Sequence, residues 1–286
     1  MLPPWASVLS ERYQTIEVVR PLSGGNLSEA WLARLDGTLR VVKWQPDPRS
    51  AIFHVETQTL KAFASSGFVQ VPDIEQISSQ CIVLQWIDTG SSKALRQAAE
   101  RLGRGLAQIH AMSVKAFELP WGQGIGVPVP PSKKYFRSGE FFVAERMHPL
   151  IRRLRQMGYM NPSWTVLEGD MSGLAEHVDQ WSRPPALLHG DLWSGNWLGN
   201  AAGIPYLIDG QGYYGDPWAD VAFSEMFGGM DPEFYRGYTS VSPLTNDYRK
   251  VRPIYQLYHA LMHLLLFGHA YESLVNRLVA DIVGEL

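Results

Sequence analysis

Three polar residues in the second half of the chain have the types and the spacing that phosphoryl transfer needs. Asp191 and Asn196 are five residues apart, and Asp209 follows a short apolar run. In kinase-type chemistry one carboxylate orients the attacking hydroxyl and accepts its proton. An amide oxygen and a second carboxylate hold the metal ions that bridge the nucleotide phosphates. Because Asp-x-x-x-x-Asn is also the spacing of a kinase catalytic loop, these residues indicate a kinase.

The alternative is that these residues only form turns, since Gly, Asp, Asn and Ser are common in turns for conformational reasons. The flanking sequence favours the catalytic interpretation. An apolar segment, residues 186–188, leads into the polar loop, and two short apolar runs, residues 197–198 and 204–208, flank a Gly- and Asn-containing segment. This pattern predicts a β-hairpin, with Asn196 just before its first strand and Asp209 at the end of its second.

The N-terminal part of the chain predicts the elements that would bind a nucleotide. Strands are expected at residues 16–19 and 30–33, joined by a glycine-containing loop, and a third at residues 39–44, where Val41 and Lys43 share a face. Helical spacing over residues 52–63 includes Glu56. Either charged residue alone is readily explained as solvated. In this order, however, they match the kinase strand Lys that contacts the α- and β-phosphates and is held by a Glu of the next helix.

A predicted strand at residues 81–88 and a predicted helix at residues 95–110 flank a small polar linker. We expect the boundary between two lobes near Asp88, giving a nucleotide-binding lobe at residues 1–88 and a catalytic and acceptor-binding lobe at residues 89–286. An adenine ring would lie at this boundary and bond to backbone groups of Gln85, Trp86 and Ile87.

Three later segments are also interpretable. Residues 120–132, rich in Gly and Pro, form an irregular loop that could cover an acceptor pocket or act as a spacer. Helices are expected at residues 141–157 and 172–181. A basic run in the first of them, containing Arg152, Arg153 and Arg155, favours a solvated face over an anion site.

Composition narrows the class of protein. The chain has 286 residues, 45% of them hydrophobic and 19% charged, which is typical of a folded protein. A formal net charge of −3 gives no sign of a nucleic-acid binder, so a small-molecule partner is expected. The single cysteine, Cys81, excludes an intramolecular disulfide and favours the cytoplasm. The apolar stretch at residues 260–267 is too short to span a membrane and predicts a buried helix.

The sequence resembles the fructosamine (ketosamine) kinases, relatives of the aminoglycoside and choline phosphotransferases that share a protein-kinase-like fold. The resemblance extends over most of the chain and is most specific at residues 189–196, where the insert Leu-Trp-Ser-Gly separates ketosamine kinases from their relatives. It implies an α+β, bilobal fold: a small N-terminal antiparallel-sheet lobe with one main helix, and a larger, mostly helical C-terminal lobe. The supporting stretches are residues 23–25, Asp209, and residues 213–216, 219–222, 226–229, 255–263 and 267–268.

The resemblance also implies roles for individual residues, with ATP and Mg²⁺ as cofactors. Asp191 would be the catalytic base, Asn196 and Asp209 the metal ligands, Lys43 the phosphate contact and Glu56 its partner, while Ser23, Gly24, Gly25 and Asn26 would cover the phosphates and Asp220 would be structural. The chain departs from the family where Gly210 and Gln211 replace a common Pro-Ala, and where Met262 and Leu265 replace typical asparagines. None of these departures falls on a residue expected to contact the phosphates or the metal ions. They affect which acceptor the protein would use.

We therefore expect ATP-dependent phosphorylation of a hydroxyl on a ketosamine, such as a fructosamine or ribulosamine, including glycated lysine or glycated protein. Expected acceptor contacts are Trp193, Tyr213, Tyr214, Asp216 and Trp218. Core packing is the alternative for these aromatic residues and is favoured for Trp197, and His259 and His263 are expected in the core.

Two other functions stay open. The first is an aminoglycoside or choline-type phosphotransferase acting on another amine-bearing acceptor. The second is a nucleotide-binding pseudokinase module, which would be expected to lack at least one of Lys43, Asp191, Asn196 and Asp209, whereas all four are present.

Overall fold

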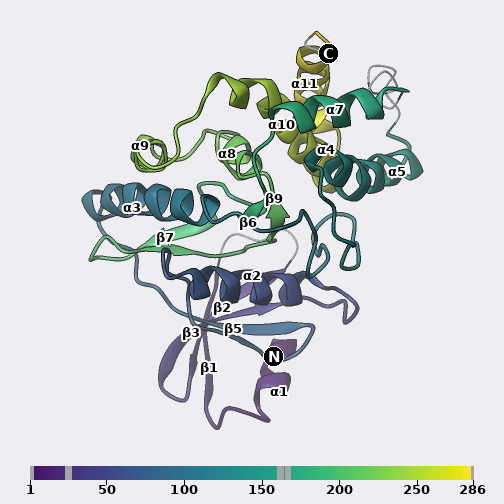
Figure 1. Ribbon diagram of the computed structural model, residues 1–286. Coiled ribbons are helices and arrows are strands. Elements are labelled where there is room, and N and C mark those ends of the chain that lie inside the picture. Colours follow the sequence, from purple (N-terminus) through teal and green to yellow (C-terminus); the bar gives the residue numbers. More distant parts are fainter. Residues whose placement is uncertain (1–2, 23–27, 160–163, 165–168, 285–286) are drawn as a thin grey trace.

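The computed structural model describes residues 3–22, 28–159, 164 and 169–284. Its N-terminal part is a five-stranded antiparallel sheet with the strand order β1-β2-β3-β5-β4 (Figure 1). The elements of this part are α1 (Pro4–Leu9), β1 (Ile16–Leu22), β2 (Glu29–Leu35), β3 (Thr38–Trp44), α2 (Ile52–Ser66), β4 (Ile74–Gln76) and β5 (Cys81–Gln85). The main helix, α2, lies between this sheet and the helical remainder of the chain (Figure 1).

The first four residues of strand β5, residues 81–84, are apolar and buried because both faces of the sheet are covered. Side chains alternate between the two faces of a strand. Cys81 and Val83 belong to the cluster that includes α1, whereas Ile82 and Leu84 belong to the cluster that includes the start of α2. Val41 of β3 packs against the second cluster, which places Lys43 on the face toward α2 as predicted.

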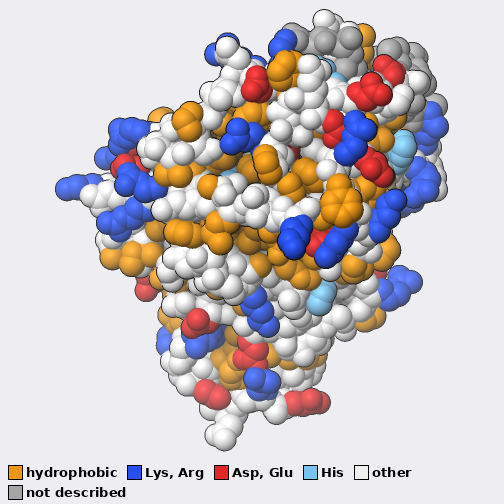
Figure 2. Space-filling model, in the orientation of Figure 1, with side chains coloured by type: hydrophobic (Ala, Val, Ile, Leu, Met, Phe, Trp, Pro, Cys, Tyr) orange, Lys and Arg blue, Asp and Glu red, His pale blue; other side chains and the backbone are white. Residues whose placement is uncertain are grey.

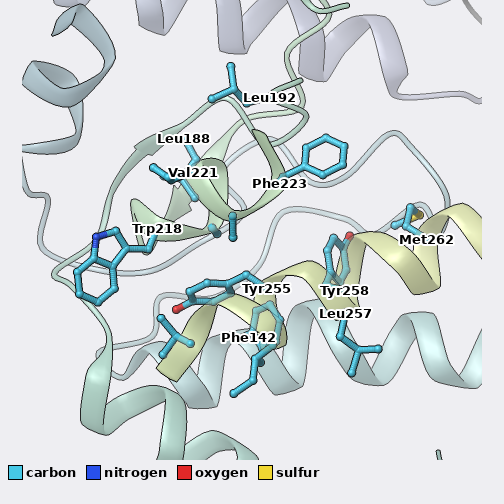
Figure 3. Packing of buried hydrophobic residues seen from close by; sticks show 14 of the residues in the cluster. Phe142, Leu188, Leu192, Trp218, Val221, Phe223, Tyr255, Leu257, Tyr258 and Met262 are labelled. Atoms are coloured by element: carbon cyan, nitrogen blue, oxygen red, sulfur yellow. The ribbon is translucent and has the colours of Figure 1, made fainter. Parts of the chain in front are cut away.

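The remainder of the chain is mostly helical and has one large core. Figure 3 shows part of that core, in which Trp218, Tyr255 and Tyr258 are buried. Its helices are α3 (Ser92–His110), α4 (Ser138–Phe141), the π-helix η1 (Phe142–Met147), α5 (His148–Gln156), α7 (Met171–Trp181), α8 (Trp218–Ser224), α9 (Pro232–Thr239), α10 (Asn246–Phe267), the 3-10 helix η2 (His269–Tyr271) and α11 (Glu272–Val283). Two small antiparallel pairs complete it, β6 (Ala186–Leu188) with β9 (Tyr213–Gly215) and β7 (Trp197–Gly199) with β8 (Pro205–Leu207).

The predicted α+β, two-lobed fold is confirmed, and so is the hairpin at β7 and β8. The helix predicted over residues 141–157 is three consecutive pieces, α4, η1 and α5. Arg152, Arg153 and Arg155 of α5 are exposed, as expected for a solvated face. Figure 2 shows one face of the molecule, on which basic side chains gather at two opposite ends, over α3 and over α5. Within the described ranges, no helix is long and apolar enough to cross a membrane.

Candidate active site

The loop after β6 holds Asp191 and Asn196 against each other. The Asn196 side-chain amide donates to the Asp191 carboxylate over 2.7 Å and to the Asp191 carbonyl over 2.8 Å. The predicted pair is therefore in direct contact. Burial raises the pKa of Asp191 to about 7, while the hydrogen bond from Asn196 acts in the opposite direction.

The buried carboxylate of Asp220, on α8, fixes the start of this loop. It accepts the backbone N–H groups of His189 over 2.6 Å and of Gly190 over 2.9 Å, and His110 Nε2 lies 3.4 Å away. Burial alone would raise the pKa of Asp220, but these donors and His110 hold it below its usual value. The structural role expected for Asp220 is confirmed.

The hairpin brings Asp209 beside Asn196. Trp197 pairs with Leu207 in the β7–β8 ladder, and the Ile208 N–H donates to the Asn196 carbonyl over 3.1 Å, so Asp209 follows one residue later. Asp209 has a φ of 59°, a left-handed conformation in which Asp is enriched over most other residues. Its carboxylate thereby turns toward β3.

Lys43 lies between two carboxylates from different parts of the fold. Its Nζ donates to both Glu56 oxygens over 2.8 Å and to Asp209 Oδ1. Burial alone would lower the pKa of Lys43, but Asp209 and Glu56 outweigh it and raise that pKa above its usual value. The predicted Lys43–Glu56 pair is confirmed, and Asp209 joins it to the catalytic loop.

Helix α2 also contacts the segment that follows Asp209. The buried Thr59 hydroxyl accepts the Gly212 N–H over 2.8 Å and donates to the Val55 carbonyl over 2.7 Å. A Cβ on Gly210 would lie 2.5 Å from the Thr59 methyl carbon. The Thr59 side chain of α2 therefore packs closely against the backbone of Gly210. This contact gives a physical reason for Gly210 in this chain.

Asn196 and Asp209 have the oxygen donors that Mg²⁺ prefers. The Asn196 side-chain nitrogen is used by Asp191, which leaves its oxygen available, and the Asp209 side chain is about one-third exposed. The described residues include no group of three or more His, Cys, Asp or Glu side chains suited to a metal ion. Magnesium is typically bound by one or two carboxylates together with substrate phosphates, so these two residues fit it.

The segment after β5 has backbone groups available for an adenine ring. Gln85 still bonds to Asp73 through its N–H. No hydrogen bond between described residues uses the backbone N–H or C=O of Trp86 or Ile87. The residues expected to cover the phosphates, Ser23, Gly24, Gly25 and Asn26, lie outside the described residues.

The expected acceptor contacts divide into surface and core residues. Trp193 is 38% exposed and Tyr214 is half-buried beside Trp121. Tyr213, Asp216 and Trp218 are buried. The Asp216 carboxylate accepts the N–H groups of Arg183 and Trp218 and the Tyr255 hydroxyl, so Asp216 and Trp218 have the structural roles of a helix start and of core packing.

A buried cluster around Arg146 was not predicted from the sequence. The Arg146 guanidinium lies over the rings of Tyr213 and Tyr258, at 4.4 Å and 4.3 Å from their centroids, and donates to Gln123. The Gln123 amide in turn donates to the carbonyls of Ile125 and Val127. Gly124 of the same loop abuts Ile52 of α2. Residues 120–132 therefore form an ordered loop that contacts both lobes.

Replacing Gly190 by alanine tests how tightly the catalytic loop is held. Gly190 has a φ of 77°, and a Cβ there would overlap the Gln211 carbonyl oxygen. Gly37 has a similar φ of 80° with no atom within 4 Å of its Cβ position. We expect Gly37→Ala to cost about 1 kcal/mol of unfolding free energy for the backbone conformation alone. Gly190→Ala should cost at least about 2 kcal/mol more and lower kcat, because the backbone must also move.

Denaturant unfolding and steady-state kinetics on both variants measure these effects. Equal losses of stability in the two variants would contradict the close packing of Gly190 against Gln211.

Together, the fold and this site define a kinase of the protein-kinase-like class. The site consists of Lys43, Glu56, Asp191, Asn196 and Asp209. A choline kinase of Streptococcus pneumoniae has the same fold, with a TM-score of 0.64 at 13% identity over 99% of this chain and 98% of that one. A candidate fructosamine-3-kinase of Thermobifida fusca is more similar, with a TM-score of 0.83 at 26% identity over 98% of both chains.

Sequence comparison narrows the class to one family. The chain is 32% identical over 286 residues to a probable ketoamine kinase of Vibrio parahaemolyticus, covering 94% of each chain. The fructosamine kinase family model matches residues 4–285. The chain belongs to the fructosamine kinase family and is an ATP-dependent phosphotransferase, so the resemblance seen in the sequence is confirmed and the pseudokinase alternative is not favoured.

Proposed function

We propose that this protein transfers the γ-phosphoryl group of ATP to a sugar hydroxyl of a ketosamine. The observation that carries this proposal is the convergence of four side chains. Asn196 bonds to Asp191, its backbone bonds to the residue before Asp209, and Asp209 pairs with Lys43. The family and the ketoamine kinase name of the Vibrio relative support a ketosamine as the acceptor.

Asp191 is the proposed catalytic base. Its carboxylate would accept a hydrogen bond from the acceptor hydroxyl, direct the oxygen at the γ-phosphorus and take the proton as the new O–P bond forms. The amide of Asn196 holds this carboxylate in one orientation. A pKa near 7 leaves a substantial fraction of Asp191 ionised at neutral pH while making it a better proton acceptor than an ordinary aspartate.

Lys43 is the proposed contact to the α- and β-phosphates, with Glu56 holding its ammonium group. Asn196 and Asp209 would hold Mg²⁺, which offsets the negative charge of the phosphates. When a nucleotide enters, Lys43 would exchange its bond to Asp209 for the phosphates and keep its bonds to Glu56. Asp209 would then be available as a metal ligand.

We propose the remaining nucleotide and acceptor contacts as follows. The adenine would bond to the backbone of Gln85, Trp86 and Ile87, at the boundary between lobes 1–88 and 89–286, and residues 23–26 would cover the phosphates. Trp193 and Tyr214 would contact the acceptor, because they are the expected acceptor residues that reach the surface.

We further propose that the protein acts in the cytoplasm on free ketosamines, glycated lysine or glycated protein. Cys81, the single cysteine, is buried and unpaired, as is usual in a reducing compartment. The net charge of −3 gives no support to a nucleic-acid partner.

A panel of acceptors tests the choice of substrate class. ADP release is measured with a fructosamine, a ribulosamine, an aminoglycoside and choline, each at the same ATP and Mg²⁺ concentrations. We expect turnover with at least one ketosamine at a kcat/KM that exceeds those of the aminoglycoside and choline by a factor of at least about 10², because a site that hydrogen-bonds a specific sugar rejects acceptors lacking those groups. Turnover with the aminoglycoside or choline alone would replace the proposed substrate class by the alternative one.

A further inference from the structure

The middle of the loop at residues 120–132 packs into the nucleotide-binding lobe. Ile125 packs against the buried cluster that contains Ile52 and Phe53 of α2 together with residues of β5. Gly124 lies against the start of the same helix, where a Cβ would be 2.5 Å from the Ile52 Cα atom. The loop therefore supports the first turn of α2.

The two sides of this loop belong to the other lobe. Hydrophobic residues on either side of Ile125 pack against the core of the helical lobe: Trp121, Val127 and Val129. The backbone N–H of Gln123 donates to the Val129 carbonyl over 2.8 Å, and the Val129 N–H donates to the Gln123 carbonyl over 3.2 Å. These two bonds close residues 123–129, which we call the strap, with Ile125 between its two ends.

Helix α10 supports the strap through two residues one turn apart. The Tyr258 hydroxyl donates to the Gln123 side-chain oxygen over 3.1 Å. Met262 lies so close to Gly126 that a Cβ on this glycine would overlap the Met262 sulfur atom. Figure 3 shows Tyr258 and Met262 projecting from the same helix, and residues four apart share a helix face. The strap therefore lies along one face of α10.

Arg146 is buried beside the strap without a counter-ion. Its exposed fraction is 4%, and within the described ranges its contacts are Gln123 and the rings of Tyr213 and Tyr258, with no carboxylate paired to it. Burying a charge is costly unless the charge is paired or hydrogen-bonded. A charged donor also makes a hydrogen bond roughly twice as strong as a neutral one. The bond from Arg146 therefore fixes Gln123 firmly.

The Gln123 side chain passes this constraint to the rest of the strap. Its oxygen accepts from Arg146 and Tyr258, and its nitrogen donates to the carbonyls of Ile125 and Val127 over 2.9 Å and 3.0 Å. These bonds use the full donor and acceptor capacity of an amide side chain. Gln123 thus sets the conformation of the segment that carries Ile125.

The strap reaches the Lys43–Glu56 pair through α2. Ile52 and Phe53 precede Glu56 by about one helical turn. The Phe53 ring centroid lies 5.9 Å from Lys43 Nζ, and both Glu56 oxygens accept from the same Nζ over 2.8 Å. A shift in the first turn of α2 would therefore move both groups that surround Lys43.

We infer that Arg146 is a positioning residue for nucleotide binding. It acts through Gln123 on the strap, and Ile125 of the strap holds the start of α2. Helix α2 in turn holds Glu56 against Lys43. This inference rests on the proposed function, in which Lys43 contacts the ATP phosphates. It assigns the strap to the nucleotide side of the reaction, where the sequence had left a cover for the acceptor or a spacer as the alternatives.

Ile125→Ala tests the strap directly. We expect the KM for ATP to rise about fivefold with a fructosamine as acceptor, while the KM for the fructosamine stays within about twofold of wild type. The dissociation constant of ATP, measured by calorimetry with Mg²⁺ and no acceptor, should rise by the same factor. Ile151→Ala is the matched control, because Ile151 is also half-buried but lies on α5 and packs against the core of the helical lobe. It should leave ATP affinity unchanged.

Arg146→Met tests whether Arg146 acts through the strap. Methionine fills much of the same volume but has no charge and no donor for Gln123. We expect the KM for ATP to rise about as much as in Ile125→Ala. The double variant should show less than the product of the two single effects, because both changes break one link. Gln123→Met breaks the same link if Arg146→Met does not fold.

Three results would overturn the inference and leave the proposed function intact. They are unchanged ATP affinity in Ile125→Ala, an equal loss in Ile151→Ala, and a rise confined to the KM for the fructosamine. Independent effects of Ile125→Ala and Arg146→Met would overturn the action of Arg146 through the strap. A wild-type protein that phosphorylates no ketosamine would overturn the proposed function, and the calorimetric measurement keeps the two failures distinguishable because it needs no acceptor.

Discussion

Replacing Asp191 by asparagine is expected to lower kcat by roughly 10² to 10⁴, the usual range for loss of a positioned general base. Asparagine has nearly the same shape as aspartate but cannot accept the hydroxyl proton at neutral pH. The nucleotide contacts proposed for Lys43 and the segment at residues 85–87 do not involve this carboxylate. ATP binding, measured by calorimetry, should therefore stay within a few-fold of wild type.

Asp281→Asn is a suitable control for this variant, because Asp281 is exposed on α11, in a different part of the fold from Asp191. It should leave kcat and stability unchanged. An Asp191→Asn protein that keeps full turnover would show that another group accepts the proton.

Asp209→Asn is expected to reduce kcat/KM by about 10² to 10³, the scale seen when one electrostatic contact to the reacting group is removed. Asparagine adopts positive φ as readily as aspartate, so the backbone at φ 59° should be kept. The loss would come from the missing charge, since a neutral amide is a weaker magnesium ligand than a carboxylate. The Mg²⁺ concentration needed for half-maximal rate should rise accordingly.

A magnesium titration of the rate at saturating ATP separates this role from a purely structural one. Lys43 keeps its two bonds to Glu56 in this variant, so its place in the site should be retained. Unchanged magnesium dependence together with a lowered kcat would argue against Asp209 as a metal ligand.

The order of the strands and helices along the chain predicted the contacts on the nucleotide-binding side of the site. A strand lysine followed by a helix glutamate is enough to expect the Lys43–Glu56 pair, because adjacent elements in a chain usually pack together. The hairpin likewise predicted that Asp209 would return beside Asn196. These contacts depend on short-range pattern and on strand pairing, both of which are visible in sequence.

Short-range sequence pattern did not predict that the residues after Asp209 are buried. Trp218 and Asp216 lie in a polar and aromatic stretch that is equally suited to a surface or to a core, and only the packing of α8 and α10 decides between them. Arg146 is a comparable case, since its position between Tyr213 and Tyr258 joins three segments far apart in the chain.

The most direct test of the whole account is to identify the product formed from ATP, Mg²⁺ and a fructosamine. We expect a new phosphomonoester on a sugar hydroxyl, detected by phosphorus NMR and by the mass of one added phosphoryl group, with one ADP formed per product. ADP formed without a phosphorylated sugar, or no reaction with any ketosamine, would contradict it.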